Sequence, residues 1–276
     1  MNYKIVADSS ADIISFDAIP FSSASLKITT AEREFTDNRE LDVHEMLLYL
    51  KSYKGRSHSS CPNTEEFLEA FGDAENIFCI TITSNLSGSY DAASKAASDY
   101  ISAHPERKVH VIDSLSVGPE SALIAEKLRE LILSGLSFEE IKEKITEYNG
   151  RTRLIFALES MHNLANNGRV NSLIAKMAGI LGIRAIGRAS DVGTLDMVCK
   201  SRGLQKTVSD VIKTMITDGY CGGKVRIHHA ENETGATLLR ETIMKSYPKA
   251  SVEIYQARGL CCFYAEHGGL LVGFET

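Results

Sequence analysis

Short apolar runs alternate with helical patterns through the first half of the chain. The run at 77–82 is almost continuously apolar, as expected for a strand buried on both faces of a parallel sheet. Residues 42–53 carry apolar side chains at helical spacing. Further strands are expected at 3–7 and 109–112, and further helices at 87–103, 119–133 and 138–148. This alternation is typical of an α/β sheet with crossover helices.

The second half follows a different pattern, which begins after a helix stop signal at Asn149-Gly150. We place a domain boundary there, which gives an N-terminal domain at 1–150 and a C-terminal domain at 151–276. A hairpin-like turn at 191–193 predicts a mixed or antiparallel sheet, so the second domain is expected to be α+β. The expected strands lie at 154–158, 184–188, 195–200, 224–228, 251–257 and 270–274, and the expected helices at 160–165, 170–181, 204–218 and 233–246.

Length and charge narrow the possible functions. The 276 residues carry a net charge of −6 without any run of like charges, so nucleic acid and anionic membranes are not expected partners. No apolar run approaches the roughly 18 residues of a membrane helix, and we expect no stable membrane insertion. The N-terminus turns polar at Asp8, before a signal peptide could form, so we expect a cytoplasmic location.

Sequence templates for metal, nucleotide and hydrolase chemistry are missing. The six cysteines show no CxxC spacing, and the histidines show no paired zinc-site spacing. No GxGxxG motif, Walker lysine loop or GxSxG nucleophile elbow occurs. We therefore expect no cofactor. A serine hydrolase stays open, because its triad can assemble from distant residues.

The clearest candidate chemistry lies in three polar loops that each follow an expected strand of the first half. The loops span 8–12, 83–89 and 113–116, and they include Ser9, Ser87 and Ser114. Because the carboxyl ends of parallel strands share one edge of a sheet, we expect the loops to form a cleft. Helix N-termini in this cleft would suit an anionic head group such as a carboxylate or phosphate. The alternative is that Ser9, Ser87 and Ser116 only cap helices.

A series of motifs also occurs in a characteristic order along the chain. The first half contains Asp8-Ser9-Ser10, Ser59-Ser60-Cys61-Pro62, Leu86-Ser87-Gly88-Ser89-Tyr90 and Asp113-Ser114, and the second half contains Gly168-Arg169 and Ser201-Arg202-Gly203. In this order the motifs resemble the DegV family, and the match covers nearly the whole chain. The resemblance implies a two-domain α/β protein that holds one long-chain fatty acid, such as palmitate, stearate or oleate, between its domains.

The resemblance further implies a carrier rather than an enzyme. Such proteins present the carboxylate of the bound fatty acid to the catalytic subunit of a separate fatty acid kinase, which forms an acyl phosphate. A carrier of this kind has no catalysis of its own and needs no cofactor besides the bound lipid. A carboxylate held by hydroxyl and N–H groups, with the acyl chain in an apolar cleft, agrees with the chemistry of the polar loops.

The resemblance also assigns residues to the head-group site by position. Ser59 takes the place of a family threonine whose hydroxyl contacts the carboxylate, and Ser60 lies beside it in the same motif. Ser87 and Gly88 take the place of the family Ser-Gly pair at a helix N-terminus. The neighbouring loops add two further candidates, Ser9 and Ser114.

Two arginines and two departures from the family pattern complete the expected site. Arg169 and Arg202 match family arginines near the pocket mouth, where the kinase would approach. Cys61 replaces a family glutamine beside the head-group site. Near the C-terminus the family has a histidine that contacts the carboxylate. Here an ungapped count places Tyr264 at that position, whereas a shifted loop would place His267 there.

Two functions of other classes stay open beside the carrier. A small-molecule kinase-substrate domain or a hydrolase could use the same cleft of serine and aspartate side chains, since related folds host several functions. Turnover by the isolated chain that Ser87→Ala abolishes would favour this enzyme hypothesis. The third hypothesis is a protein-interaction module without a small ligand, whose partner binding would tolerate an enlarged side chain in the cleft.

Overall fold

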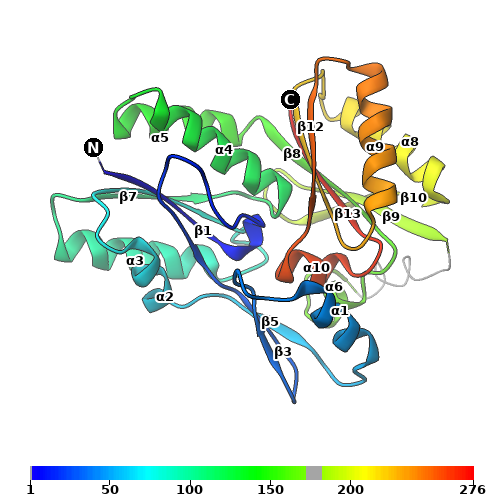
Figure 1. The fold of residues 1–276 in the computed structure, drawn as a ribbon, viewed down its shortest axis with the longest axis horizontal. Helices are drawn as coiled ribbons and strands as arrows, with labels where there is room; N and C mark the ends of the chain where they lie inside the picture. Colours follow the sequence, from blue (N-terminus) through cyan, green and yellow to red (C-terminus); the bar gives the residue numbers. More distant parts are fainter. Residues whose placement is uncertain (1, 172–181) are drawn as a thin grey trace.

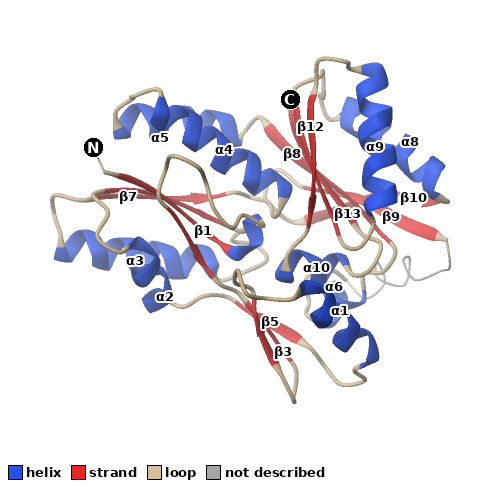
Figure 2. Cartoon of the chain, in the orientation of Figure 1, coloured by secondary structure: helices blue, strands red, loops and turns tan. Residues whose placement is uncertain are grey.

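The computed structural model describes residues 2–171 and 182–276. The chain forms two larger sheets that lie side by side, each flanked by helices, and a small third sheet beside them (Figures 1 and 2). Within the described ranges no helix has both the length and the apolar character needed to span a membrane. The helix expected at 170–181 lies outside the described residues, apart from its first two positions.

The first sheet contains four parallel strands in the order β2-β1-β6-β7. Their bounds are Phe21–Ala24 for β2, Tyr3–Asp8 for β1, Asn76–Thr81 for β6 and Lys108–Asp113 for β7. Helices α2 (Thr64–Phe71) and α3 (Ser89–Ala103) pack on one face against Val6, Ile77 and Cys79. The parallel α/β sheet expected from the apolar runs is confirmed.

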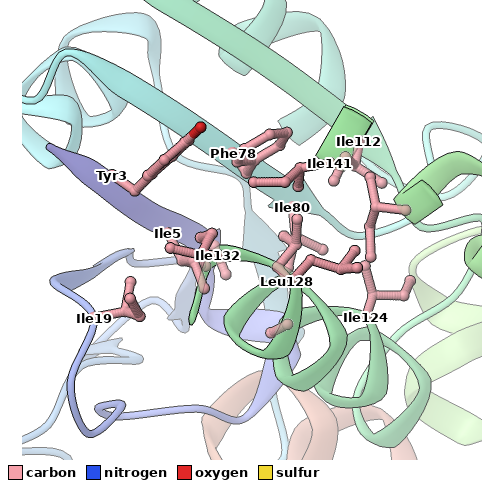
Figure 3. Packing of buried hydrophobic residues seen from close by; sticks show 14 of the residues in the cluster. Tyr3, Ile5, Ile19, Phe78, Ile80, Ile112, Ile124, Leu128, Ile132 and Ile141 are labelled. Atoms are coloured by element: carbon pink, nitrogen blue, oxygen red, sulfur yellow. The ribbon is translucent and has the colours of Figure 1, made fainter. Parts of the chain in front are cut away.

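The other face of the first sheet carries its larger apolar cluster. Helices α4 (Pro119–Leu133) and α5 (Phe138–Asn149) bury Ile124, Leu128 and Ile141 against Ile5 and Phe78 of the sheet (Figure 3). Both faces of β1 and β6 are therefore covered by helices, which explains their nearly continuous apolar sequences.

The second sheet is mixed and has six strands in the order β10-β9-β8-β13-β11-β12, of which only β11 and β12 pair in parallel. The bounds are Thr152–Leu158 for β8, Ile183–Ala189 for β9, Leu195–Arg202 for β10, Lys224–His229 for β11, Ser251–Gln256 for β12 and Leu270–Glu275 for β13. Helices α8 (Leu204–Thr217) and α9 (Glu233–Ser246) cover one face. The predicted hairpin at 191–193 joins β9 to β10, with Gly193 at a φ of +77°.

A layer that the sequence patterns did not predict lies next to both larger sheets. It contains the antiparallel sheet β4-β3-β5 and several short helices around it. The bounds are Glu34–Thr36 for β4, Lys27–Thr29 for β3, His58–Ser60 for β5, Ser9–Ala11 for the 3-10 helix η1, Val43–Ser52 for α1, His162–Asn166 for α6 and Gly259–Ala265 for α10. Of these elements only α1 and α6 were expected, because strands of three residues are too short to show an alternating pattern.

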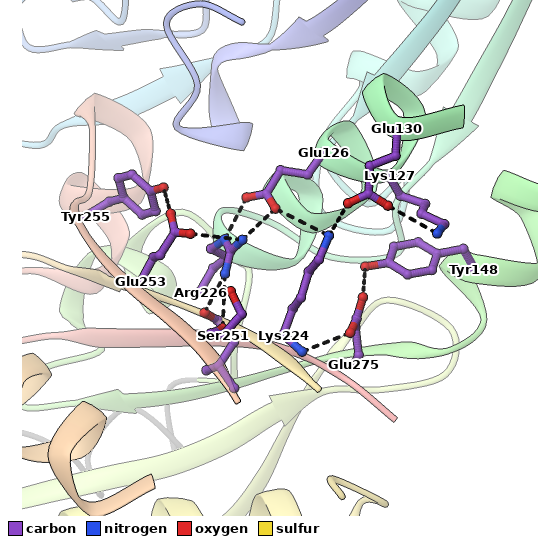
Figure 4. A network of polar contacts seen from close by, with 11 residues as sticks. Glu126, Lys127, Glu130, Tyr148, Lys224, Arg226, Ser251, Glu253, Tyr255 and Glu275 are labelled. Atoms are coloured by element: carbon purple, nitrogen blue, oxygen red, sulfur yellow. Dashed lines mark hydrogen bonds and ion pairs between the residues drawn. The ribbon is translucent and has the colours of Figure 1, made fainter. Parts of the chain in front are cut away.

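The two halves of the chain are joined by a network of ion pairs that extends from buried Arg226 to exposed Glu130 and Glu253 (Figure 4). The guanidinium of Arg226 on β11 donates two hydrogen bonds, of 2.6 and 2.7 Å, to the carboxylate of Glu126 on α4. The Arg226 side chain is only 5% exposed, and Glu253 on β12 lies 3.4 Å from it. Helix α4 thus packs on the first sheet by its apolar residues and is tied to the second sheet by Glu126.

Candidate functional site

An apolar pocket lies where the first sheet's loops, the small sheet and the second sheet meet. Its walls are mostly apolar, and its cavity volume is about 70 Å³, so the pocket is narrow. The apolar lining consists of Leu26, Ile82, Leu86 and Val117 from the first half and Leu154, Phe156, Leu158, Leu164, Leu195, Leu260, Cys261, Ala265 and Leu271 from the second.

Four polar side chains also line the pocket, and they lie next to one another. The hydroxyls of Ser59 and Tyr264 are 2.6 Å apart. The guanidinium of Arg169 lies 5.8 Å from the centre of the Tyr264 ring, and its Nε donates to the carbonyl oxygen of Leu86, beside Ser87, at 3.2 Å. The pocket therefore has one polar side, formed by Ser59, Ser87, Arg169 and Tyr264, in an otherwise apolar lining.

Short elements of the unpredicted layer place this polar cluster. Ser59 pairs with Ile28 on the small sheet, and strand alternation turns its side chain away from that of Ser60. Tyr264 lies on α10, whose first amides, from Gly259 and Leu260, each donate 2.9 Å hydrogen bonds to the carboxylate of Asp37. A Cβ at Gly259 would lie 2.7 Å from that carboxylate, so the close approach requires glycine.

The polar cluster offers hydrogen-bond donors to an anion. One hydroxyl of the Ser59–Tyr264 pair donates to the other, so the accepting hydroxyl keeps its own proton for a ligand. Burial raises the pKa of the Tyr264 phenol despite the nearby Arg169 charge, so the phenol stays protonated at neutral pH. Helix α3 begins beside Ser87 and Gly88. Its first amide, from Ser89, donates to the Ser87 hydroxyl at 3.3 Å, and the next two amides have no acceptor within the helix. A carboxylate matches these donors and the Arg169 charge.

The three loops predicted to share one sheet edge do lie together. Asp8 accepts a 2.9 Å hydrogen bond from the amide of Ile82, and Asp113 accepts one of 3.1 Å from the amide of Ser84. The N-cap residues of η1, α3 and α4 are Asp8, Gly88 and Gly118, but the Ser87 hydroxyl accepts a 3.3 Å hydrogen bond from the Ser89 amide at the start of α3, so a capping role for Ser87 stays open.

Besides Gly88, five of the sequence-predicted site residues lie outside the pocket lining. Ser60 is exposed, and the buried Ser9 hydroxyl accepts a 3.0 Å hydrogen bond from the amide of Leu26. Ser114 is also buried and lines a separate polar cavity beside Glu120 and Thr152. The other two are His267, which lies 3.8 Å from Glu231 in a surface groove, and Arg202, which is exposed at the end of β10. Gly88 follows the lining residue Ser87 directly in the chain, and a Cβ there would lie 3.3 Å from the sulfur of Cys61.

Neither a metal-binding cluster nor a serine–histidine pair occurs in the described part of the chain. Among residues 2–171 and 182–276, no group of three or more His, Cys, Asp and Glu side chains could hold a metal ion. The buried His228 lies 2.8 Å from Asp12, but neither residue lines the apolar pocket. Throughout the described part of the chain, no serine hydroxyl is hydrogen-bonded to a histidine ring.

Sequence reasoning missed most residues that shape the pocket. Asp37, which holds the start of α10, carries no sequence signal that distinguishes it from an exposed loop aspartate. The apolar lining residues were visible only as strand and helix positions, because their convergence depends on the packing of distant elements. The short apolar run at 259–265 could have indicated α10, but a run of this length is equally compatible with a buried helix and with a strand.

Comparison with known proteins places the chain in a family. The family model described as "Uncharacterised protein, DegV family" matches residues 2–275. A DegV domain-containing protein of Streptococcus pneumoniae is 43% identical over 282 residues, which cover 100% of this chain and 99% of that protein.

Solved structures are similar over the same length. A DegV family protein from Eubacterium eligens, loaded with heptadecanoic acid, is 44% identical with a TM-score of 0.97, and 99% of each chain is covered. The Fatty Acid Kinase (Fak) B3 protein of Streptococcus pneumoniae, loaded with linoleic acid, is 42% identical with a TM-score of 0.98, covering 100% of this chain and 99% of that one. The sequence motifs, the mixed α/β fold and the whole-length matches agree, and the chain belongs to the DegV family.

Proposed function

We propose that this protein binds one long-chain fatty acid, with the acyl chain in the apolar pocket and the carboxylate at the polar cluster of Ser59, Ser87, Arg169 and Tyr264. The observation that carries the proposal is the pocket itself, a narrow, mostly apolar channel with donors gathered on one side. Burying an acyl chain stabilises the complex by about 0.8 kcal/mol per methylene group, while the donors fix the orientation of the carboxylate.

The pocket's position supports a ligand held between two domains, divided near residue 150. Lining residues come from both sides of that point, and β8 begins at Thr152 directly after α5. The similar proteins from Eubacterium eligens and Streptococcus pneumoniae were loaded with heptadecanoic and linoleic acid. Their ligands support a fatty acid of similar chemistry for this chain.

We further propose that the protein is a carrier without its own catalysis. It would present the bound carboxylate, in the cytoplasm, to the catalytic subunit of a separate fatty acid kinase. The name of the Streptococcus pneumoniae relative, Fatty Acid Kinase B3, supports such a partner. Arg169 suits the meeting point, because it lies at the pocket's polar side, while the exposed Arg202 is the second docking candidate.

The experiment has a binding step and a transfer step. Adding palmitate or oleate at 100 times the Kd should stabilise the fold by about 2.7 kcal/mol, measured as a rise in melting temperature. With a fatty acid kinase subunit and ATP, the loaded protein should yield acyl phosphate, whereas the protein alone should not turn over.

Variants separate docking from binding. Arg202→Ala should spare lipid binding and impair acyl phosphate formation, whereas Arg169→Ala should weaken both, because Arg169 lies in the polar cluster proposed to hold the carboxylate. Arg151→Ala, an exposed arginine beyond the end of α5, is the matched control and should change neither. Unchanged lipid binding in the Arg169 variant would leave Arg169 with a docking role only. Normal phosphorylation in both variants would contradict the docking assignment.

A further inference from the structure

Strand β8 forms one wall of the pocket and carries large side chains where the neighbouring strand β9 carries small ones. On the pocket side, β8 presents Leu154, Phe156 and Leu158, and the corresponding side of β9 carries Ala185, Gly187 and Ala189. Within this wall, Phe156 pairs directly with Gly187 across the antiparallel ladder. The largest side chain of the wall therefore faces the residue that has no side chain.

The ring of Phe156 lies over Gly187. A Cβ built at residue 187 would lie 2.2 Å from Cζ and 2.6 Å from Cε2 of Phe156, so the ring occupies the space that any other residue would fill. An aromatic ring that covers a cross-strand glycine lies down onto the sheet instead of standing away from it. Phe156 is 2% exposed and lines the pocket, so the position of its ring limits the width of the channel.

The position of Phe156 along the channel follows from the direction of β8. The strand ends at Leu158, close to α6. The side chain of Asn163 on α6 donates a hydrogen bond to the carbonyl oxygen of Phe263 on α10, next to Tyr264 of the polar cluster. The strand begins at Thr152, whose hydroxyl lies 2.8 Å from the Glu120 carboxylate on α4. At about 3.4 Å per residue, Phe156 lies roughly 7 Å from Leu158 along β8, in the direction away from α6. In the proposed binding mode the ring faces the acyl chain rather than the carboxylate.

We propose that the Phe156–Gly187 pair sets the width of the acyl channel and thereby selects fatty acids by chain shape. This inference rests on the proposed function. With the ring lying on Gly187, the channel has room for a bend in the chain, such as a cis double bond. A Cβ at residue 187 would push the ring into the channel and penalise a bent chain more than a straight one. A smaller residue at 156 would do the opposite.

The test compares oleate with stearate, which have the same length and differ by one cis double bond. In Phe156→Leu the ratio of oleate affinity to stearate affinity should rise by about fivefold, because the smaller side chain leaves more room for the bend at the double bond than the ring does. Ile155→Val is the matched control, since Ile155 is the neighbouring buried residue on the opposite face of β8. This control should lower stability and leave the affinity ratio within about twofold of wild type.

Gly187→Ala tests the opposite direction and should lower the same ratio. The new Cβ would also lie 2.5 Å from the carbonyl oxygen of Asp196, a clash that can prevent folding. If Gly187→Ala does not fold, the inference is tested by Phe156→Leu alone. An unchanged ratio in Phe156→Leu, with both affinities shifted equally, would overturn the inference. Wild-type protein that binds neither acid would instead contradict the proposed function, so the two failures are distinguishable.

Discussion

At the scale of single residues, the polar side of the pocket depends on two hydroxyls from distant parts of the chain. We expect Ser59→Ala to weaken fatty-acid binding by about 1.5–3 kcal/mol, the range for a hydrogen bond to a charged group. Ser87→Ala should have an effect of the same size. The measurement is a titration with oleate followed by calorimetry.

Ser60→Ala is the control for these two variants. Ser60 neighbours Ser59 on β5, but its side chain is exposed and lies outside the pocket lining. Its replacement should leave the affinity unchanged. Wild-type affinity in both Ser59→Ala and Ser87→Ala would show that the carboxylate binds elsewhere.

Glu120 provides a second residue-scale prediction, on pH. Burial raises the pKa of this carboxyl group to about 7. Because the raised pKa belongs to the folded state, its contribution to stability is complete below about pH 4.5 and is lost as the pH rises through 7. A shift of this size corresponds to about 3 kcal/mol. Urea unfolding across pH 4.5–7.5 should therefore show a smaller loss of stability in Glu120→Gln than in wild type, and equal slopes would contradict this.

The sequence predicted the polar residues of the pocket better than the apolar ones. Ser59, Ser87, Arg169 and Tyr264 stand in motifs that a family resemblance can locate, and all four line the pocket. Phe156 and Leu271 do not belong to any such motif. They lie side by side in the pocket wall only because β8 pairs with β13, which is more than 100 residues away in the sequence. The choice between Tyr264 and His267 likewise needed the structure, which places only Tyr264 at the pocket.

At the scale of elements, α10 carries Tyr264 and depends on Asp37 for its N-terminus. Asp37→Asn keeps the side-chain shape but replaces one of the two accepting oxygens with an NH2 donor, so one amide of α10 loses its acceptor, which should cost about 1 kcal/mol of stability. Because Tyr264 lies on the same helix, oleate affinity should fall as well. Both quantities are measurable by thermal unfolding with and without oleate.

The control at this scale is a cap far from the pocket. Ser137 caps α5 by accepting a hydrogen bond from the Glu140 amide, and it takes no part in the pocket lining. Ser137→Ala should therefore lower stability without changing oleate affinity. A loss of affinity in Ser137→Ala equal to that of Asp37→Asn would show that general destabilisation, not α10, controls binding.

Long elements were predictable and short ones were not. The sequence pattern placed α4 at 119–133, and the structure has it at Pro119–Leu133, where Pro at the first helical position and an amphipathic pattern agree. The strands β3, β4 and β5 have three residues each, and α10 is a seven-residue run of mostly buried residues. The conformations of these short elements are fixed by tertiary contacts such as the hydrogen bonds of Asp37. Such contacts produce no periodic pattern of apolar residues in the sequence.

At the scale of the whole molecule, the buried pair of Glu126 and Arg226 holds α4 to the second sheet. Glu126→Ala should destabilise the protein by roughly 3 kcal/mol, because it leaves a mostly buried guanidinium without its main partner. The exposed pair of Lys95 and Asp99 on α3 is the matched control, and Asp99→Ala should cost less than about 0.5 kcal/mol. Urea unfolding measures both, and equal effects would contradict the role of the buried pair.

The parallel first sheet and mixed second sheet were predictable from the change in pattern near residue 150. The part played by α4 was not, because a single helix sequence does not show that it contacts both sheets. The division into two domains with a ligand between them therefore stays a proposal, supported by the composition of the pocket lining.

Native mass spectrometry of the freshly purified protein, with extraction and identification of any lipid, tests the central claim most directly. The account predicts one fatty acid per chain, or uptake of one equivalent when palmitate or oleate is added to delipidated protein. A protein that is empty and stays empty with both acids would contradict it, and the enzyme hypothesis would then take its place.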